Sequence, residues 1–158
     1  MITTEYIKSV WRGGLKDSFL TLKNTFPNYK IYITGHGLGG AMATLCTATI
    51  TRAGMVDRKR RICSRFTSFP ITDMYRITHA ADQIVNLPRI KSLEGFMHHG
   101  TEVWYNNDMS INSKYKICAG DDTKWCLEHH DNNEFNFADH LAYFNVNVEN
   151  FGSSGCEQ

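Results

Sequence analysis

A glycine-rich turn between two patterned segments is the part of the sequence best suited to chemistry. The run Gly35-His36-Gly37-Leu38-Gly39 follows the branched and aromatic residues Ile31 to Ile33 and precedes a helical pattern. A strand, a tight turn and a helix in this order build either a phosphate-binding loop or a nucleophile elbow, in which a strained turn holds a serine clear of the sheet.

The five residues Gly35 to Gly39 favour the elbow. A Walker loop needs a lysine followed by serine or threonine after its last glycine, and a dinucleotide loop needs Gly-x-Gly-x-x-Gly with an acidic residue about 20 positions later. The five residues spell neither pattern. They match Gly-x-Ser-x-Gly, except that Gly37 stands where the serine belongs. The sequence therefore predicts an elbow without its nucleophile.

Four segments of the chain resemble the class 3 lipases, the fungal-type triacylglycerol lipases, and they follow one another in the same order as in that family. They resemble the parts that carry the elbow, the acidic triad member, the strand after it and the catalytic histidine, and they are Thr34–Gly40, Tyr75–Pro88, Gly100–Tyr105 and Asp139–Phe144. The family has Thr-Gly-His-Ser-Leu-Gly-Gly in the first segment. With the loop between Cys118 and Cys126 and the asparagine-rich run 105–110, the set is most similar to the nematode branch of the family.

The resemblance implies a Ser-His-Asp triad with two members present. His140 matches the base, and Asp82 matches the acid that fixes the histidine tautomer. The backbone N–H of Leu38, directly after the nucleophile position, matches one oxyanion donor. Gly37 has no side chain that can attack an ester, so we expect a pseudoenzyme. Glycine also relieves the strained backbone that a serine must adopt at an elbow.

No neighbouring residue is a better nucleophile. His36 lies next to the vacant position, but the family has a histidine there that is not the nucleophile. The remaining candidates lie in unrelated contexts, and they are Ser9, Ser64, Ser68 and Ser92. A water activated by His140 stays open as an alternative.

The resemblance implies an α/β architecture, a partial α/β-hydrolase fold with a mostly parallel sheet and helices on both faces. We expect a single lipase-like domain over residues 1–158. Helical periodicity over Thr3 to Phe26 is broken at Gly13-Gly14. Met74 to His79 and His99 to Tyr105 are predicted strands.

The elbow strand of this fold lies in the middle of the sheet. In the family, some of its neighbours, the second oxyanion donor and the lid come from residues that would precede position 1. We therefore expect a fragment, a truncated gene model or a degenerate paralogue that lacks the amino-terminal part of the family fold. An unpaired sheet edge is then exposed, and oligomers could form through it.

Composition limits the partners. With 158 residues, a formal net charge of +1 and 42% hydrophobic residues, the chain gives no reason to expect nucleic acid. No stretch approaches the roughly 18 apolar residues of a membrane span. A lipid or acyl ester is the ligand class that the resemblance implies, and no cofactor is expected. The pairs His98-His99 and His129-His130 lack the spacing of a zinc site, so we expect no metal.

The cysteines and the amino terminus indicate different compartments. Residues 1–8 lack the basic and apolar blocks of a signal peptide, which predicts a cytosolic chain. Cys118 and Cys126 bracket a short polar loop at a spacing that suits a disulfide, which belongs to oxidising compartments, and the relatives are typically secreted. Cys46, on the apolar helix face, is predicted to be a buried thiol, and Cys156 has no evident partner. The compartment stays open.

Three hypotheses of function follow. The first is a catalytically silent hydrolase of the acylglycerol lipase type. The second is a lipid-binding module that keeps the acyl pocket and binds fatty acid without turnover. The third is an active secreted lipase represented by a truncated or variant sequence, since serine and glycine codons can differ by one base.

Overall fold

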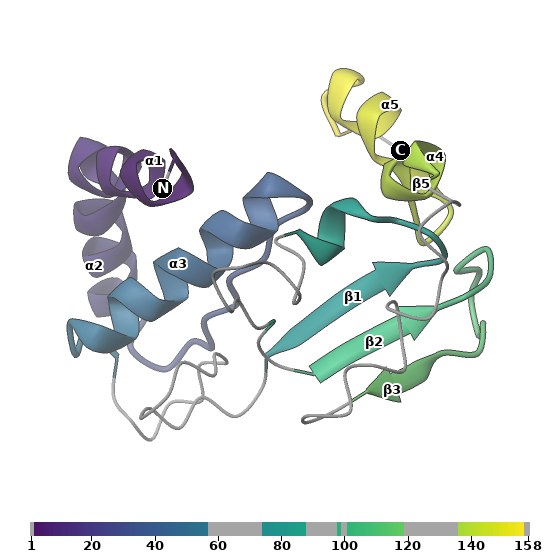
Figure 1. Cartoon of the computed structure of the whole chain (residues 1–158). Helices are drawn as coiled ribbons and strands as arrows, with labels where there is room; N and C mark the ends of the chain where they lie inside the picture. Colours follow the sequence, from purple (N-terminus) through teal and green to yellow (C-terminus); the bar gives the residue numbers. More distant parts are fainter. Residues whose placement is uncertain (1, 57–73, 88–97, 99–100, 119–135, 157–158) are drawn as a thin grey trace. The chain divides into compact units, whose positions relative to one another are not determined.

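The computed structural model describes residues 2–56, 74–87, 98, 101–118 and 136–156 (Figure 1). They fall into two compact units, Met1–Met74 and Tyr75–Gln158. Among the described residues, the first unit is built of helices and the second of a sheet with short helices.

The first unit opens with a broken helix, as the glycine pair predicts. Helix α1 (Ile2–Val10) runs into a π-helical turn, η1 (Trp11–Leu15), and then into α2 (Lys16–Thr25). Gly14 in η1 has a φ of 121°, a backbone conformation that glycine adopts without the steric cost of a Cβ. The predicted helical segment and its break are therefore confirmed.

Helix α3 (Leu38–Arg52) supplies the core of the first unit. Ile50, on the predicted apolar face, is buried together with Val56. The partly buried side chains that pack on these two come from η1, α2, the segment before the elbow, α3 and the residues after it, and they are Trp11, Phe19, Ile31, Ile33, Cys46 and Met55. Thr47 is also buried, and its hydroxyl donates to the carbonyl oxygen of Ala43 at 2.8 Å.

The segment before the elbow is not a strand in the structure, contrary to prediction. Ile31 and Ile33 pack on the core of the first unit, whereas Tyr32 is 84% exposed, so the side chains alternate as they would in a strand. A strand also needs a hydrogen-bonded neighbour. No other described residue forms a ladder with this segment.

The sheet of the second unit has three described strands. β1 (Tyr75–His79) pairs in parallel with β2 (Thr101–Tyr105), and β2 pairs antiparallel with β3 (Lys116–Cys118). Both predicted strands are confirmed. The antiparallel edge formed by β3 was not predicted, and it makes this sheet a mixed one.

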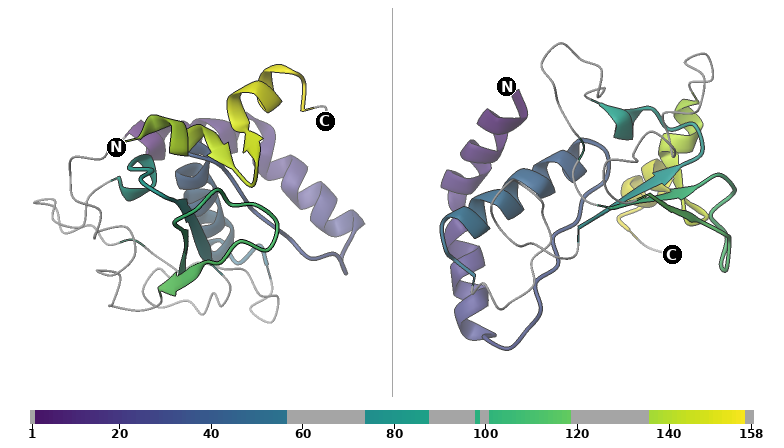
Figure 2. Two further views of the ribbon diagram at one scale, coloured as in Figure 1. Left: turned by 90° about the vertical axis from the view of Figure 1, so that its right-hand side faces the viewer. Right: turned by 60° about the horizontal axis from the view of Figure 1, so that its bottom comes forward.

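The chain after β1 and the carboxyl-terminal segment complete the second unit. A 3-10 turn, η2 (Ile84–Asn86), follows β1. The last segment contains α4 (Phe137–Leu141), a hairpin of β4 (Ala142–Tyr143) and β5 (Val146–Asn147), and α5 (Val148–Ser153). Figure 2 shows these elements following one another from yellow-green to yellow. The hairpin loop is Phe144-Asn145, with φ of 52° and 61°, the positive values that a two-residue type I′ turn requires.

A buried polar network ties the first two strands together. Arg76 and Glu102 are direct partners in the register, and the guanidinium Nη2 lies 2.9 Å from the Glu102 Oε2 atom. The Thr78 hydroxyl donates to Oε1 of the same carboxylate at 2.8 Å, and the Arg76 Nη1 donates to the carbonyl oxygen of Val85 at 3.2 Å. A carboxylate as buried as that of Glu102 needs such partners. The network therefore holds β1, β2 and η2 in fixed relation.

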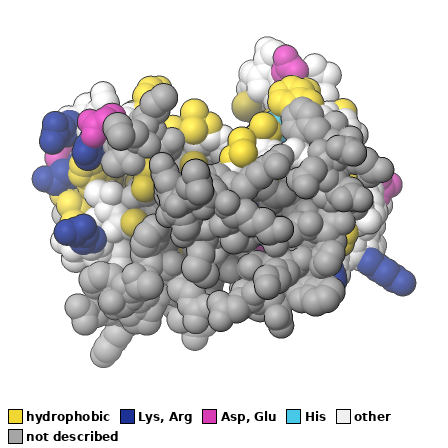
Figure 3. Space-filling view, in the orientation of Figure 1, with side chains coloured by type: hydrophobic (Ala, Val, Ile, Leu, Met, Phe, Trp, Pro, Cys, Tyr) yellow, Lys and Arg dark blue, Asp and Glu magenta, His cyan; other side chains and the backbone are white. Residues whose placement is uncertain are grey.

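Charges of both signs share the surface of the first helices. Figure 3 shows basic and acidic side chains side by side over α1 and α2. One exposed pair there is Lys8 with Glu5, at 2.6 Å. Among the described residues, no helix has both the length and the apolarity needed to cross a membrane.

Candidate functional site

The predicted elbow turn is present in the first unit. Gly37 precedes α3 with φ 54° and ψ −123°, a conformation that residues with a side chain rarely adopt. The Gly39 N–H donates to the His36 carbonyl at 2.8 Å, and the Gly40 N–H donates to the Gly37 carbonyl at 3.0 Å. Leu38 is the first residue of α3, so its N–H has no carbonyl one turn earlier in the helix to pair with. The backbone has the shape of an elbow whose outermost residue lacks a side chain.

The glycines on either side allow this turn to close. A Cβ built on Gly35 would lie 2.2 Å from both the carbonyl carbon and the carbonyl oxygen of Gly39, and 2.7 Å from the Gly40 nitrogen. A Cβ built on Gly39 would meet no atom within 4 Å. The strand-side glycine is therefore required by close packing on the first turn of α3, and the helix-side glycine is not.

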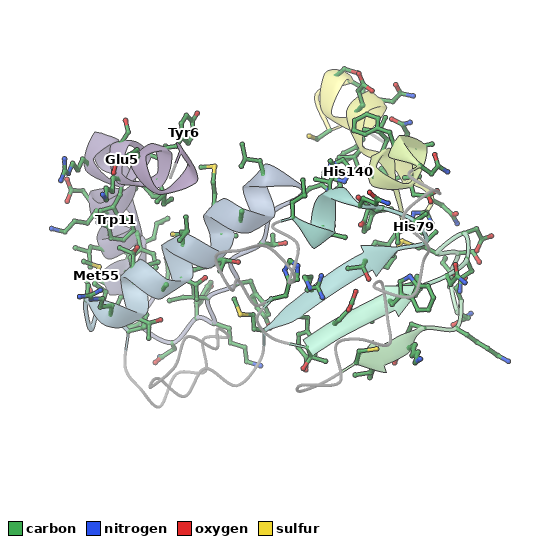
Figure 4. All side chains as sticks on the ribbon, in the orientation of Figure 1. Glu5, Tyr6, Trp11, Met55, His79 and His140 are labelled. Carbon is green, nitrogen blue, oxygen red and sulfur yellow. The ribbon has the colours of Figure 1, made fainter. Side chains whose placement is uncertain are left out.

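The second unit brings Asp82 and His140 into contact across 58 positions of sequence. The Nδ1 atom of His140, on α4, lies 2.9 Å from the Oδ2 atom of Asp82, in the loop after β1. Asp82 is fully buried, and the His140 side chain is 12% exposed (Figure 4). The Asp82 N–H donates to the His79 carbonyl at 2.9 Å, which continues β1 into this loop. The two side chains have the geometry of an acid that orients a histidine base.

Two further donors hold the Asp82 carboxylate. The Ile84 N–H donates to Oδ1 at 2.9 Å, and the Tyr143 hydroxyl donates to Oδ2 at 2.8 Å. Burial raises the pKa of Tyr143 well above its usual range, and the negative charge of Asp82 raises it further. The phenol is therefore kept protonated as a donor.

Sequence reasoning assigned Tyr143 to the core and missed its bond to the acid. Its position three residues after His140 is the local signal that could have found it, because the β4–β5 hairpin begins directly after α4. The two-residue loop of that hairpin follows Tyr143 immediately.

A second histidine, which the sequence did not single out, lies next to this pair. His79 ends β1 and is 7% exposed. Its Nδ1 atom lies 3.0 Å from the carbonyl oxygen of Asp139, and its Nε2 atom lies 2.7 Å from the carbonyl oxygen of Asn107. The Ala81 N–H donates to the Asp139 carboxylate at 3.0 Å. Residues on both sides of Ala80 thus bind the residue directly before His140, and Figure 4 shows the two labelled histidines near the end of β1.

The cysteine predictions have different outcomes. Cys46 and Cys156 are free thiols; Cys46 is half-buried rather than fully buried, and burial raises the pKa of its thiol. Cys118 is buried at the end of β3. Its predicted partner, Cys126, lies outside the described residues, so the pairing stays a prediction.

The remaining candidate residues are divided between the two units and the ranges outside the described residues. Gly37 and Leu38 belong to the first unit, and Asp82 and His140 belong to the second. His98 is half-buried, whereas His99, His129 and His130 lie outside the described residues. No group of three or more His, Cys, Asp or Glu side chains that could hold a metal ion occurs within the described ranges.

Comparison with known proteins identifies the family. A family model described as Lipase (class 3) matches residues 2–72. A lipase of Caenorhabditis elegans is 28% identical over 173 residues, which cover 84% of this chain and 49% of that lipase. The secreted mono- and diacylglycerol lipase 1 of Fusarium solani is 29% identical, over 68% of this chain and 36% of its own length. These matches support a member of the class 3 lipase family.

Solved structures of class 3 lipases share its fold. Lipase II from Rhizopus niveus has a TM-score of 0.70 and 26% identity, covering 89% of this chain and 58% of that one. The lipase from Rhizopus microsporus var. chinensis has a TM-score of 0.68 and 28% identity, covering 89% and 53%. The fold is accordingly a partial α/β-hydrolase fold, as predicted. The chain spans about half the length of the nematode lipase, at 49%, and less of the fungal one, at 36%.

The family match also separates two kinds of glycine loop. The exclusion of a dinucleotide loop from the five residues Gly35 to Gly39 needs a correction, because Gly35, Gly37 and Gly40 together have the spacing Gly-x-Gly-x-x-Gly. The glycine pattern alone does not distinguish an elbow from a dinucleotide loop. The match to the class 3 lipase model over residues 2–72 covers this run and favours the elbow.

The close approach at Gly35 predicts a steric effect on stability. Gly35→Ala should lower the free energy of unfolding by about 1–3 kcal/mol, because the new methyl overlaps the Gly39 carbonyl group. Denaturant unfolding measures the change. The matched variant Gly39→Ala, whose methyl meets nothing, should be neutral or up to about 1 kcal/mol more stable, since alanine favours the helix. Equal effects of both substitutions would contradict the packing at the elbow.

The bond from Tyr143 to Asp82 predicts a loss of stability without it. Tyr143→Phe should lower the free energy of unfolding at pH 7 by about 1.5–3 kcal/mol, the range for a hydrogen bond to a charged group. Tyr115→Phe is the control, because this exposed ring keeps its contact with Tyr105 at 5.4 Å. Similar losses in both variants would show that the Tyr143 hydroxyl has no special role.

The raised pKa of Tyr143 predicts how this difference changes with pH. A group whose pKa is higher in the folded state contributes its full stability below the pKa of the unfolded group, about 10 for tyrosine, and loses it as the pH rises further. The difference in unfolding free energy between wild type and Tyr143→Phe should therefore shrink above about pH 10, by up to about 1.4 kcal/mol per pH unit. A difference that stays constant up to pH 11 would contradict the burial of a protonated phenol.

Proposed function

We propose that this chain is a catalytically silent member of the class 3 lipases, a lipase-like α/β-hydrolase domain related to acylglycerol ester hydrolases. Gly37 occupies the nucleophile position, the Leu38 N–H is one donor of the oxyanion hole at the elbow, and Asp82 and His140 are the acid and the base. The observation that carries the proposal is the residue at the elbow: its backbone has φ 54° and ψ −123° and it has no side chain.

The chemistry of the remaining pair follows from its hydrogen bonds. Asp82 accepts from the Nδ1 atom of His140, which favours the tautomer with its proton on Nδ1 and its lone pair on Nε2. In a complete triad, Nε2 takes the proton of the serine while the serine oxygen attacks the ester carbonyl. Gly37 offers neither a proton nor an attacking oxygen, so no acyl-enzyme forms. Triads that lose a member keep only about 10³- to 10⁴-fold acceleration over water, from binding and the oxyanion hole.

We further propose that residues 1–158 form one domain and that Cys118 pairs with Cys126. The solved class 3 lipases support the first proposal, because each matches this chain over 89% of its length and so extends across both units. The buried position of Cys118 at the end of β3, and its absence from the free thiols of the described residues, support the second.

The proposal predicts no ester hydrolysis that depends on His140. Purified chain should hydrolyse a short-chain p-nitrophenyl ester no faster than its His140→Ala variant, because the histidine has no hydroxyl to activate. Initial rates at several enzyme concentrations measure this. An activity of the wild type that disappears in His140→Ala would overturn the proposal and favour a water activated by His140.

Replacing Gly37 by serine tests which defect silences the site. Gly37→Ser should gain hydrolysis that is lost again in the double variant with His140→Ala. Removing the serine of a complete triad costs about 10⁶-fold in kcat, which is the upper limit of the gain. The matched variant Gly37→Ala places a side chain at the same positive φ but has no hydroxyl. Both variants should therefore lower the free energy of unfolding by about 1–3 kcal/mol, and only the serine variant should gain activity. A serine variant no more active than the alanine variant would show that the missing hydroxyl is not what silences the chain.

A further inference from the structure

We propose that His79 is a positioning residue that fixes the base His140 against the acid Asp82 by donating hydrogen bonds from both of its ring nitrogens. This inference rests on the proposed function in one respect, since it takes Asp82 and His140 as the acid–base pair.

The two contacts of His79 define what the ring must donate. Both contacts go to backbone carbonyl oxygens, that of Asn107 at 2.7 Å and that of Asp139 at 3.0 Å. A carbonyl oxygen only accepts, and a neutral imidazole has one N–H and one lone pair. A neutral ring could therefore satisfy one contact while directing its lone pair at the other oxygen. Both contacts are favourable only when both nitrogens carry a proton, that is, in the imidazolium form.

The position of the two acceptors explains why this ring affects the site. Asp139 is the residue directly before His140 on α4, and Asn107 follows β2. The ring, at the end of β1, thus joins the helix that carries the base to the turn after the neighbouring strand. The Ala81 N–H adds a second link, to the Asp139 carboxylate at 3.0 Å.

Asn107, the acceptor that follows β2, is fixed by hydrogen bonds of its own side chain. The side-chain oxygen of Asn107 accepts from the Met109 N–H at 2.9 Å, and its amide nitrogen donates to the Lys114 carbonyl at 2.6 Å. Met109 is buried, with 2% exposure. The Asn107 carbonyl is therefore a rigid point, and a bond to it limits how far the ring can move.

The groups that face His79 can compensate a positive ring. On its own loop, Asp82 is two residues beyond Ala80 and donates its N–H to the His79 carbonyl. From α4 come Asp139, whose carboxylate also accepts from the Asn136 side chain at 3.0 Å, and His140. From β4, the Tyr143 ring lies edge-on at 5.6 Å. The residues that bond to His79 or contact its ring on these elements therefore include two acidic residues, Asp82 and Asp139, and one phenol, Tyr143. Charge-assisted hydrogen bonds offset part of the cost of burying the charge.

The first measurement needs no variant. In the full chain labelled with ¹⁵N-histidine, the His79 ring should show two N–H correlations, one for each nitrogen. The reference is a peptide of residues 75–83 at the same pH. It contains neither Asp139 nor Asn107, so its ring N–H protons should exchange rapidly with water. A single protonated ring nitrogen for His79 in the folded chain would overturn the proposal.

The second measurement asks whether His79 acts on the pair. The readout is the downfield proton resonance of the His140 Nδ1–H bonded to Asp82, and its exchange rate with water. His79→Ala should speed this exchange by about tenfold or more, the effect of losing one hydrogen bond to a charged group. His79→Gln, which keeps a donor for one of the two carbonyls, should show a smaller increase.

The control separates positioning from a general loss of stability. Ile77→Ala shortens an exposed side chain on the same strand and leaves both hydrogen-bond acceptors of His79, the carbonyl oxygens of Asn107 and Asp139, in the sequence. It should lower the unfolding free energy and leave the His140 resonance unchanged. An equal change in exchange rate in Ile77→Ala and His79→Ala, or no change in His79→Ala, would overturn the positioning role.

A further variant distinguishes this failure from a failure of the acid–base pair. Asp82→Asn should abolish the downfield His140 resonance. If the wild type shows no resonance that depends on Asp82, the pair itself is wrong. If the resonance depends on Asp82 and is indifferent to His79, only the positioning proposal fails.

Discussion

The buried charge of Asp82 is the constraint on which the second unit depends. A carboxylate removed from water is costly unless several donors replace its hydration. Here the donors come from three elements: the Ile84 N–H at the start of η2, the His140 ring on α4 and the Tyr143 hydroxyl on β4. The acid therefore holds these three elements around the end of β1. An arrangement usually explained by catalysis is also what keeps this unit folded.

In the first unit, too, the contacts that shape the candidate site also contribute to packing. The elbow turn is closed by contact between the Gly35 backbone and the first turn of α3, and the helix behind it provides Ile50 to the core. Neither contact involves the side chain at position 37. The contacts that close this turn therefore do not depend on the side chain at position 37.

The parts of the site that sequence analysis found have local signatures. The glycine turn and α3 follow from the periodicity around residues 35–52, and Asp82 and His140 lie in segments that resemble class 3 lipases. What it missed depends on contacts distant in sequence. The Tyr143 hydroxyl reaches Asp82 across 61 positions and the His79 ring reaches Asp139 across 60. Only the place of Tyr143 close to His140 gave a local signal, and no local pattern indicates the contact of His79.

The same distinction explains the errors in the fold. Ile31 to Ile33 alternate as a strand does, but a ladder depends on a partner elsewhere in the chain. β3 has only three residues, two of them exposed, so its sequence carried too little alternation to predict an antiparallel edge.

The positive φ of Gly37 has a consequence for the history of the protein. A change from serine to glycine at such a position removes a hydroxyl and also releases backbone strain, so it lowers activity and raises stability in one step. The reverse change must restore strain before any benefit of catalysis is available. Other destabilising substitutions that accumulate meanwhile would use up the stability gained and make that return harder. Under the proposed function, a serine at this position would therefore cost stability before it contributed any activity.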